Sequence, residues 1–107
     1  MNKAVIKNIK LMEFGSSFGT RELGKKIRVE VEEFIQQGCR IMFDFKGVHM
    51  ISSAFADEIF GKLFIIIGEE EFKSRVKING FDNEEDKKVI LFLIQKGISF
   101  RKDEGLQ

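Results

Sequence analysis

Apolar and polar positions along the chain repeat with two different periods, which predicts alternating strands and helices. The most regular helical pattern covers residues 20–37, where apolar side chains return every three or four positions. This pattern begins at Thr20, a typical N-cap residue, and ends at Gly38, a typical helix stop. The next segment, Arg40–Phe45, is apolar at nearly every position and therefore predicts a central strand of a sheet.

Three further segments have the pattern of strands. Lys3–Leu11 carries apolar residues on both sides, which predicts a strand with two covered faces. Arg75–Asn79 predicts another short strand, and Ile98–Phe100 predicts an edge strand near the end of the chain. Together with the central strand, these segments predict a mixed sheet of about four strands.

Two more helices are expected between these strands. The first opens at Ser52 and Ser53, carries an apolar stripe and ends at Gly68; the stripe consists of Phe55, Ile59, Leu63 and Ile66. The acidic run Glu69–Glu71 then predicts a solvated loop. Asp82 and Glu85 have capping-box spacing, which predicts a helix to about Lys96 that Gly97 terminates. The expected fold is a small α/β layer with about three helices packed against the sheet.

Composition limits the function classes. The 107 residues are enough for a single domain, residues 1–107, and the net charge of +1 gives no field that would attract nucleic acid or a membrane surface. The single Cys39 and the spacing of the carboxylates predict no disulfide, no metal site and no cofactor. Three lysines interrupt the first twelve residues, so we expect a cytoplasmic protein without a signal segment.

The candidate chemistry lies where the strand Arg40–Phe45 is followed by a turn and a helix. Ser52 and Ser53 place hydroxyl groups at the start of this helix, where serine is a preferred cap and where an anion is also favoured. Two interpretations therefore remain open: the serines cap the helix, or one of them accepts a phosphate. Asp57 and Glu58 follow about one turn later, either as solvated first-turn acids or as contacts for a partner.

The string FKGVHMISSAFADE, residues 45–58, resembles the phosphoacceptor region of STAS domains, the anti-sigma-factor-antagonist fold. Gly47-Val48 match the small-plus-Val turn, Ser53 falls on the phosphorylatable serine, and Gly61-Lys62 fall on a Gly-Arg/Lys pair in the helix. The string is most similar to a STAS-like subfamily associated with histidine-kinase-like ATPases, whose members read F-x-G-V and then I-S-S-x-F-A-D-E. The FGTR element, which ends at Arg21, resembles a second string of the same subfamily.

This resemblance implies a bacterial regulatory module that binds a partner and is not an enzyme. Its partner would be a histidine-kinase-like or anti-sigma-type ATPase, which would phosphorylate Ser53, with Ser52 as the alternative acceptor. The added charge would then repel a docked partner near Asp57 and Glu58. The residues expected to contact the partner are Arg21, Ser52, Phe55, Asp57, Glu58 and Lys62.

Other functions are weighed against this one. The runner-up is a constitutive accessory subunit of an ATPase-containing system, such as phage defence, in which the serines only cap the helix. A hydrolase would pair His49 with Ser53, but no oxyanion hole is identified. The loop Gly15–Arg21 lacks the Gly-Lys-Ser/Thr ending of a P-loop, which argues against nucleotide binding by this chain.

Overall fold

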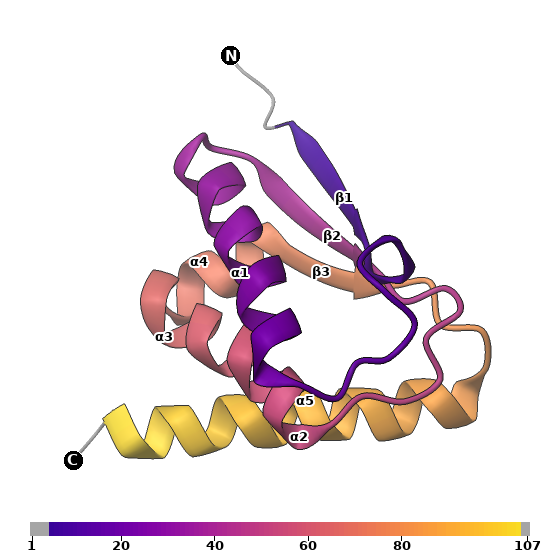
Figure 1. Ribbon diagram of the computed structural model, residues 1–107. Helices are drawn as coiled ribbons and strands as arrows, with labels where there is room; N and C mark the ends of the chain where they lie inside the picture. The colour runs from indigo at the N-terminus through magenta and orange to yellow at the C-terminus, as the bar shows by residue number, and fades with distance from the viewer. Residues whose placement is uncertain (1–4, 106–107) are drawn as a thin grey trace.

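The sheet in the computed structural model, which describes residues 5–105, has three strands that all run parallel (Figure 1). These strands are β1 (Ile6–Lys10), β2 (Arg40–Asp44) and β3 (Val76–Asn79), in the order β1-β2-β3. The central position of β2 is as predicted. The prediction of a mixed sheet with about four strands is wrong, because the described residues form three strands with both pairings parallel.

Within residues 5–105, helices cover one face of this sheet and leave the other open. Ile41 and Phe43 of β2 point into the core, and Val76 of β3 lies beside Ile41 in register. Ile6 of β1 and Val5 directly before it are exposed, so the expectation of two covered faces for this strand is wrong. The segment is a strand, as predicted, but β1 lies at the edge of the sheet, and its outward apolar residues are not covered by any other described residues. Lys3 and Ala4, which the predicted strand also includes, lie outside the described residues.

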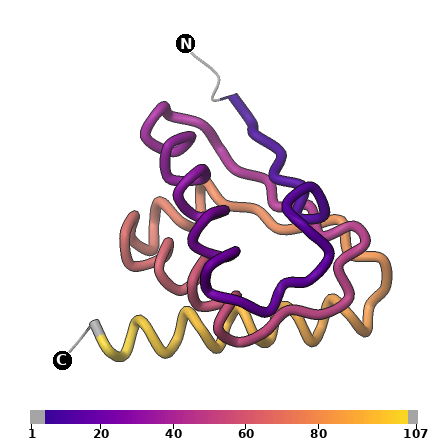
Figure 2. The backbone as a smooth tube through the Cα atoms, in the orientation of Figure 1, coloured from indigo at the N-terminus to yellow at the C-terminus, as the bar shows by residue number. Residues whose placement is uncertain are grey.

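The helical segment 53–67 lies at the centre of the helical part, and other helices surround it. The π-helical turn η2 (Asp57–Gly61) lies in the middle of this segment and contacts α1 (Arg21–Gln36) and α5 (Glu84–Gly105) on different sides (Figure 2). Because η2 is enclosed in this way, all of its residues are buried. The helical elements are η1 (Leu11–Glu13), α1 (Arg21–Gln36), α2 (Ser53–Ala56), η2 (Asp57–Gly61), α3 (Lys62–Ile67), α4 (Glu69–Arg75) and α5 (Glu84–Gly105).

Helix α5 is longer than the sequence predicts. Ile98–Phe100 is helical and not an edge strand, because Ile98 continues the buried stripe that Ile90 and Ile94 begin. Gly97 does not end the helix. This glycine lies where α5 packs against η2, and a Cβ atom at this position would lie 3.4 Å from the Asp57 Cα atom, which is an ordinary van der Waals distance.

The start of α5 also differs from the expected capping box by one residue. The Asn83 side-chain oxygen accepts a hydrogen bond from the Asp86 amide at 2.8 Å, and its amide group donates to the Asp86 carboxylate at 2.9 Å. Asp82 instead accepts from the Gly47 amide at 2.9 Å. The helix start was therefore predicted correctly, but by the wrong pair of residues.

Two details of the segment before β3 depart from expectation. Ile66 is exposed although it was placed in a buried stripe, because the extra residue in the π turn rotates the following residues, and Phe64 is buried instead. Glu69–Glu71 does not form a loop but the first turn of α4, where the helix dipole favours carboxylates. Phe72 secures this short helix by packing against Phe64, with a distance of 5.4 Å between ring centroids.

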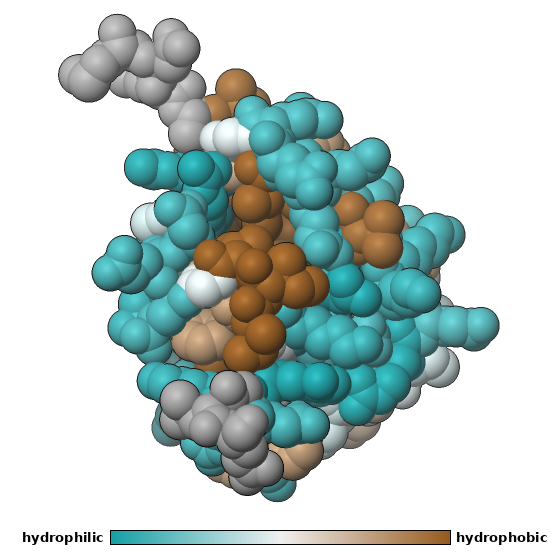
Figure 3. Space-filling model, turned by 90° about the vertical axis from the view of Figure 1, so that its left-hand side faces the viewer, coloured by the Kyte–Doolittle hydropathy of each residue, from teal (hydrophilic) through white to brown (hydrophobic). Residues whose placement is uncertain are grey.

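Apolar side chains also gather on the surface. Figure 3 shows an apolar stripe bordered by polar residues on the side where α1, α3 and α4 lie. Val29 of α1 and Ile65 and Ile66 of α3 are among the exposed large apolar residues. Part of the apolar content of these helices therefore stays outside the core.

Candidate functional site

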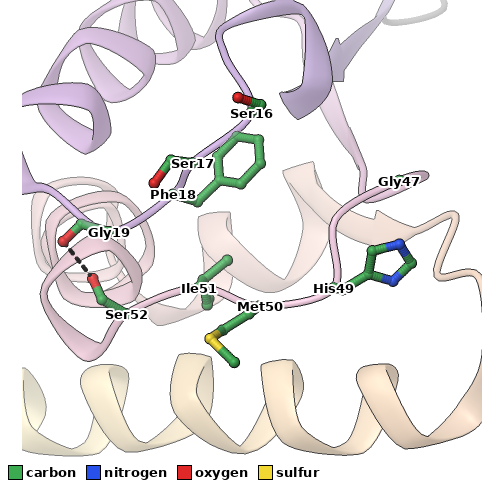
Figure 4. Close-up of a pocket in the computed structure, with 9 residues that line it drawn as sticks. All are labelled: Ser16, Ser17, Phe18, Gly19, Gly47, His49, Met50, Ile51 and Ser52. Atoms are coloured by element: carbon green, nitrogen blue, oxygen red, sulfur yellow. Dashed lines mark hydrogen bonds between the residues drawn. The ribbon is translucent and has the colours of Figure 1, made fainter.

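The two serines occupy different environments, which decides which of them caps the helix. The Ser52 hydroxyl accepts a hydrogen bond from the Phe55 amide at 3.0 Å and donates one to the Gly19 carbonyl at 2.9 Å (Figure 4). Ser52 is thus the N-cap of α2, and its hydroxyl is engaged both as an acceptor and as a donor. It also ties the start of α2 to the loop before α1.

Ser53 is exposed at the first position of α2. Its hydroxyl makes no hydrogen bond to any residue of the described range 5–105. Of the two candidate acceptors, Ser53 is therefore the one whose oxygen is accessible and uncommitted.

These environments predict unequal losses of stability for two matched substitutions. Ser52→Ala is expected to lower the free energy of unfolding by about 1–2 kcal/mol, because the cap and the bond to Gly19 are both lost. Ser53→Ala is expected to change it by less than about 0.5 kcal/mol, because the site is exposed. Urea unfolding of both variants measures the difference. An equal loss in the two variants would contradict the assignment of the cap.

Ser53 opens onto a cleft of about 310 Å³ between α2, η2 and α5. Cations dominate its charged lining, since Arg21, Lys96 and Arg101 face a single carboxylate, Asp57. The remaining lining is largely apolar and includes Ala54, Leu93, Gly97 and Phe100. The cleft therefore combines a free hydroxyl, an excess of positive charge and an apolar wall.

Asp57 is held by two arginines from different helices. Arg101 contacts its carboxylate through Nε and Nη2, both at 2.7 Å, and Arg21 Nη1 contacts it at 2.7 Å. The hydrogen bonds from Arg101 lower the pKa of Asp57 against the effect of burial, and those from Arg21 lower it further. The carboxylate remains ionised at neutral pH, with both of its oxygens occupied.

Glu58 is buried beside it and has its own set of cations. Lys62 Nζ lies 2.9 Å and Arg28 Nη2 3.1 Å from its carboxylate, and Arg21 Nη1 lies 3.4 Å away. Burial acts to raise the pKa of Glu58, but the hydrogen bonds from Lys62 and Arg28 outweigh it, so the pKa is lowered. The interpretation of Asp57 and Glu58 as solvated acids is therefore wrong; both are buried and paired.

The two strings that carry the family resemblance contact each other. Phe18 packs edge-to-face on Phe55 with centroids 5.5 Å apart, and Gly19 accepts the hydrogen bond from Ser52. Arg21, the last residue of FGTR, contacts Asp57 of the FADE string. The loop before α1 is thus part of the same site as the serines.

The residues expected to contact a partner are placed unequally. Arg21, whose side chain is 51% exposed, and Lys62, which is partly exposed, reach the surface. Phe55 is fully buried and Glu58 nearly so. Neither side chain therefore has exposed surface that a partner could contact in this conformation. Their burial follows from the position of this helical segment between α1 and α5.

Three cations of the site were missed in the sequence: Arg28, Lys96 and Arg101. Arg101 is 44 positions from Asp57, and Arg28 is 30 positions from Glu58. No local spacing connects such pairs. The available signal was the placement of two carboxylates in a helix with a strong apolar stripe, because a buried carboxylate needs a counter-charge.

His49 does not pair with either serine. Its Nδ1 lies 2.7 Å from the Asp86 carboxylate, and its Nε2 lies 3.8 Å from that of Asp82. Figure 4 shows His49 and Ser52 at opposite ends of a second cleft of about 350 Å³, and His49 is not among the residues that line the Ser53 cleft. Both ring nitrogens face carboxylates, so the arrangement gives no Ser-His nucleophile pair.

The His49 contact predicts a pH dependence of stability. The hydrogen bond with Asp86 raises the pKa of His49, and the charge of Asp82 acts in the same direction. The contribution is complete below the unfolded pKa of about 6.5 and is lost as pH rises through the higher folded pKa. Urea midpoints should therefore fall from pH 6 to pH 8 more in the native chain than in His49→Gln. A parallel decrease in both proteins would exclude this contact as the cause.

The described residues contain neither a cluster of metal ligands nor a helix that could span a membrane. Within residues 5–105, no three His, Cys, Asp or Glu side chains are grouped as metal ligands. In the same range, every helix is too short or too polar to cross a membrane. The candidate functional site is the cation-lined cleft at Ser53.

The fold and this site define a small α/β domain of the STAS-like class. The chain belongs to the family described as the STAS-like domain of unknown function, DUF4325, whose model matches residues 24–86. The match includes Ser53, Asp57 and Glu58 and ends before Lys96 and Arg101. No curated protein and no solved structure matches the chain.

Proposed function

We propose that this chain is a regulatory protein-interaction module whose binding surface is centred on Ser53 and is switched by phosphorylation. The observation that carries the proposal is the free, exposed Ser53 hydroxyl in a cation-lined cleft, next to a serine that already serves as the cap. A residue needed only for capping would have the environment of Ser52. Membership of the STAS-like family supports a regulatory or interaction role in general.

The proposed partner is a histidine-kinase-like ATPase or an anti-sigma-type kinase. Its docking surface would include the Ser53 cleft and the outer side of α5, where Phe92 and Phe100 are each 63% exposed. Lys96 lies between them in sequence and on the same side of the helix by its spacing of four from each. Exposed aromatic residues beside a cation suit a partner segment that is apolar and acidic.

The proposed role of the chain is that of a substrate and binding partner, not of an enzyme. Ser53 has no hydrogen-bonded base within the described residues, and the nearby Asp57 carboxylate is occupied by Arg21 and Arg101. An unactivated serine hydroxyl is a weak nucleophile. Phosphoryl transfer to Ser53 would therefore depend on the ATPase, which supplies ATP, Mg²⁺ and the catalytic groups.

Intact-protein mass spectrometry with site mapping tests the proposal. With MgATP alone, the chain should neither hydrolyse ATP nor become labelled; with the ATPase, it should gain one phosphate at Ser53. Ser53→Ala should abolish labelling, and Ser52→Ala, which keeps the acceptor, should retain it. Labelling of the isolated chain would overturn the non-enzymatic role. Absence of labelling by a verified active ATPase would favour the constitutive accessory subunit.

A further inference from the structure

We propose that the Ser53 cleft is a phosphate-binding site that holds the phosphate of phosphorylated Ser53 within the same chain, through Arg21, Arg101 and Lys96. The inference rests on the proposed phosphorylation of Ser53 and adds what the chain does with the phosphate. It replaces the expectation that the added charge would act by repelling a docked partner near Asp57 and Glu58. The phosphate of phosphoserine 53 would be bound by side chains of its own domain before any partner contacts it.

The charge of the cleft matches a phosphate. Among the residues that line the cleft, Arg21, Lys96 and Arg101 contribute three positive charges and Asp57 one negative charge, which leaves two net positive charges. Outside the lining, Glu58 lies 3.4 Å from Arg21, and Glu104 acts on Arg101. A phosphoserine carries a charge of about −1.5 to −2 at neutral pH. Phosphorylation would therefore bring the cleft close to neutrality and would not add a second anion to an anionic surface.

Unused hydrogen-bond donors are available for the phosphate oxygens. Arg21 contacts Asp57 and Glu58 through Nη1 alone, so that its Nε and Nη2 donate to no residue of the described range. Arg101 uses Nε and Nη2 for Asp57 and leaves Nη1. Lys96 is exposed and makes no ion pair within residues 5–105. Guanidinium groups bind phosphate with a planar pair of donors. Arg21 can therefore bind the phosphate through Nε and Nη2 while Nη1 stays on the two carboxylates.

This geometry changes how the switch would act. In the unmodified chain, the cationic cleft and the exposed Phe100 beside it are open to an acidic segment of the partner. In the modified chain, the phosphate of Ser53 would occupy Arg21 and Lys96 and close the same site. Phosphorylation would then release a partner by competition for cations within the cleft.

Phosphorus NMR of the full chain tests the site without the ATPase. Phosphoserine is installed at position 53 by genetic encoding, and the second pKa of the phosphate is measured by pH titration in the folded chain and in urea. Cations stabilise the dianion, so the folded value should lie about one pH unit below the unfolded value. Equal values in the two states would overturn the proposal.

A matched pair of double variants identifies the cations responsible. Arg21→Gln with Lys96→Gln should return the phosphate pKa most of the way to its unfolded value. Lys26→Gln with Lys87→Gln removes the same charge from exposed positions on the same two helices, outside the cleft, and should leave the lowered value in place. An equal effect of both pairs would show a general field in place of a site. Circular dichroism confirms that each variant is folded.

A further arm separates a phosphate of Ser53 from one supplied by another molecule. Inorganic phosphate is titrated into the unmodified and the phosphoserine proteins, and the arginine side-chain NMR signals are followed. Shifts in the unmodified protein alone would support one site already filled by the modification. Equal shifts in both proteins would overturn the proposal, because the cleft would still be open. A failure of the ATPase to label Ser53 would instead overturn the proposed switch and leave these measurements intact.

Discussion

Asp57→Ala is expected to lower the free energy of unfolding by about 2–3 kcal/mol. The substitution leaves Arg101 without its two contacts at 2.7 Å and Arg21 without its contact at 2.7 Å. Removing one partner of a buried ion pair typically costs about 3–5 kcal/mol. We expect a smaller loss of stability here because the side chains of Arg21 and Arg101 are 51% and 26% exposed and can be hydrated in the variant.

The pH dependence gives this prediction a second measurement. Because Arg101 and Arg21 lower the pKa of Asp57, its contribution is present above the unfolded pKa of about 4 and is lost as pH falls through the lower folded value. The difference in stability between the native chain and Asp57→Asn should therefore shrink between pH 5 and pH 2. Urea midpoints at several pH values measure it.

The control for charge removal is Asp103→Ala. Asp103 is an exposed carboxylate of the same helix as Arg101 and makes no ion pair within the described residues. Its substitution should change the stability by less than about 0.5 kcal/mol. If Asp57→Ala and Asp103→Ala unfold at the same urea concentration, the network around Asp57 contributes nothing to stability.

The sequence predicted those parts of the fold that depend on neighbouring residues. Thr20 accepts a hydrogen bond from the Leu23 amide and starts α1, and Gly38 and Gly68 have positive φ angles where helices end. Each of these signals acts within one turn of the chain. The same reasoning was wrong at Gly97, because a glycine at a helix end and a glycine at a helix contact look alike in a single sequence.

Only the part of the site that lies within short sequence strings was predicted. Ser53, Asp57 and Arg21 were named from strings in the sequence, and the structure brings all three to one cleft. Arg101 and Lys96 belong to the part of α5 around the predicted helix end, so nothing connected them with Ser53 before the fold was known. A basic residue on an exposed helix has no sequence signal that distinguishes it from a solubilising lysine.

The contact between η2 and α5 predicts a strong effect for Gly61→Ala. A Cβ atom at position 61 would lie 2.6 Å from Asp57 Oδ1, 3.1 Å from Arg101 Cγ and 3.1 Å from the Gly97 carbonyl oxygen. The carboxylate cannot move away freely because two arginines hold it, and the carbonyl belongs to the α5 backbone. Overpacking of this kind costs about 1–3 kcal/mol, more than the gain of about 1 kcal/mol in helix propensity. We therefore expect a net loss of up to about 2 kcal/mol.

The matched variant is Gly97→Ala on the opposite side of the same contact. Its Cβ atom would lie 3.4 Å from the Asp57 Cα atom, an ordinary van der Waals distance, and would gain the same helix propensity. Its urea midpoint should stay at or slightly above the native value, whereas that of Gly61→Ala should fall. This contact gives a physical reason for the glycine of the Gly61-Lys62 pair, because the missing side chain leaves room for the Asp57 carboxylate, which binds Arg101 of α5. A stable Gly61→Ala variant with intact pH dependence would refute this role for Gly61.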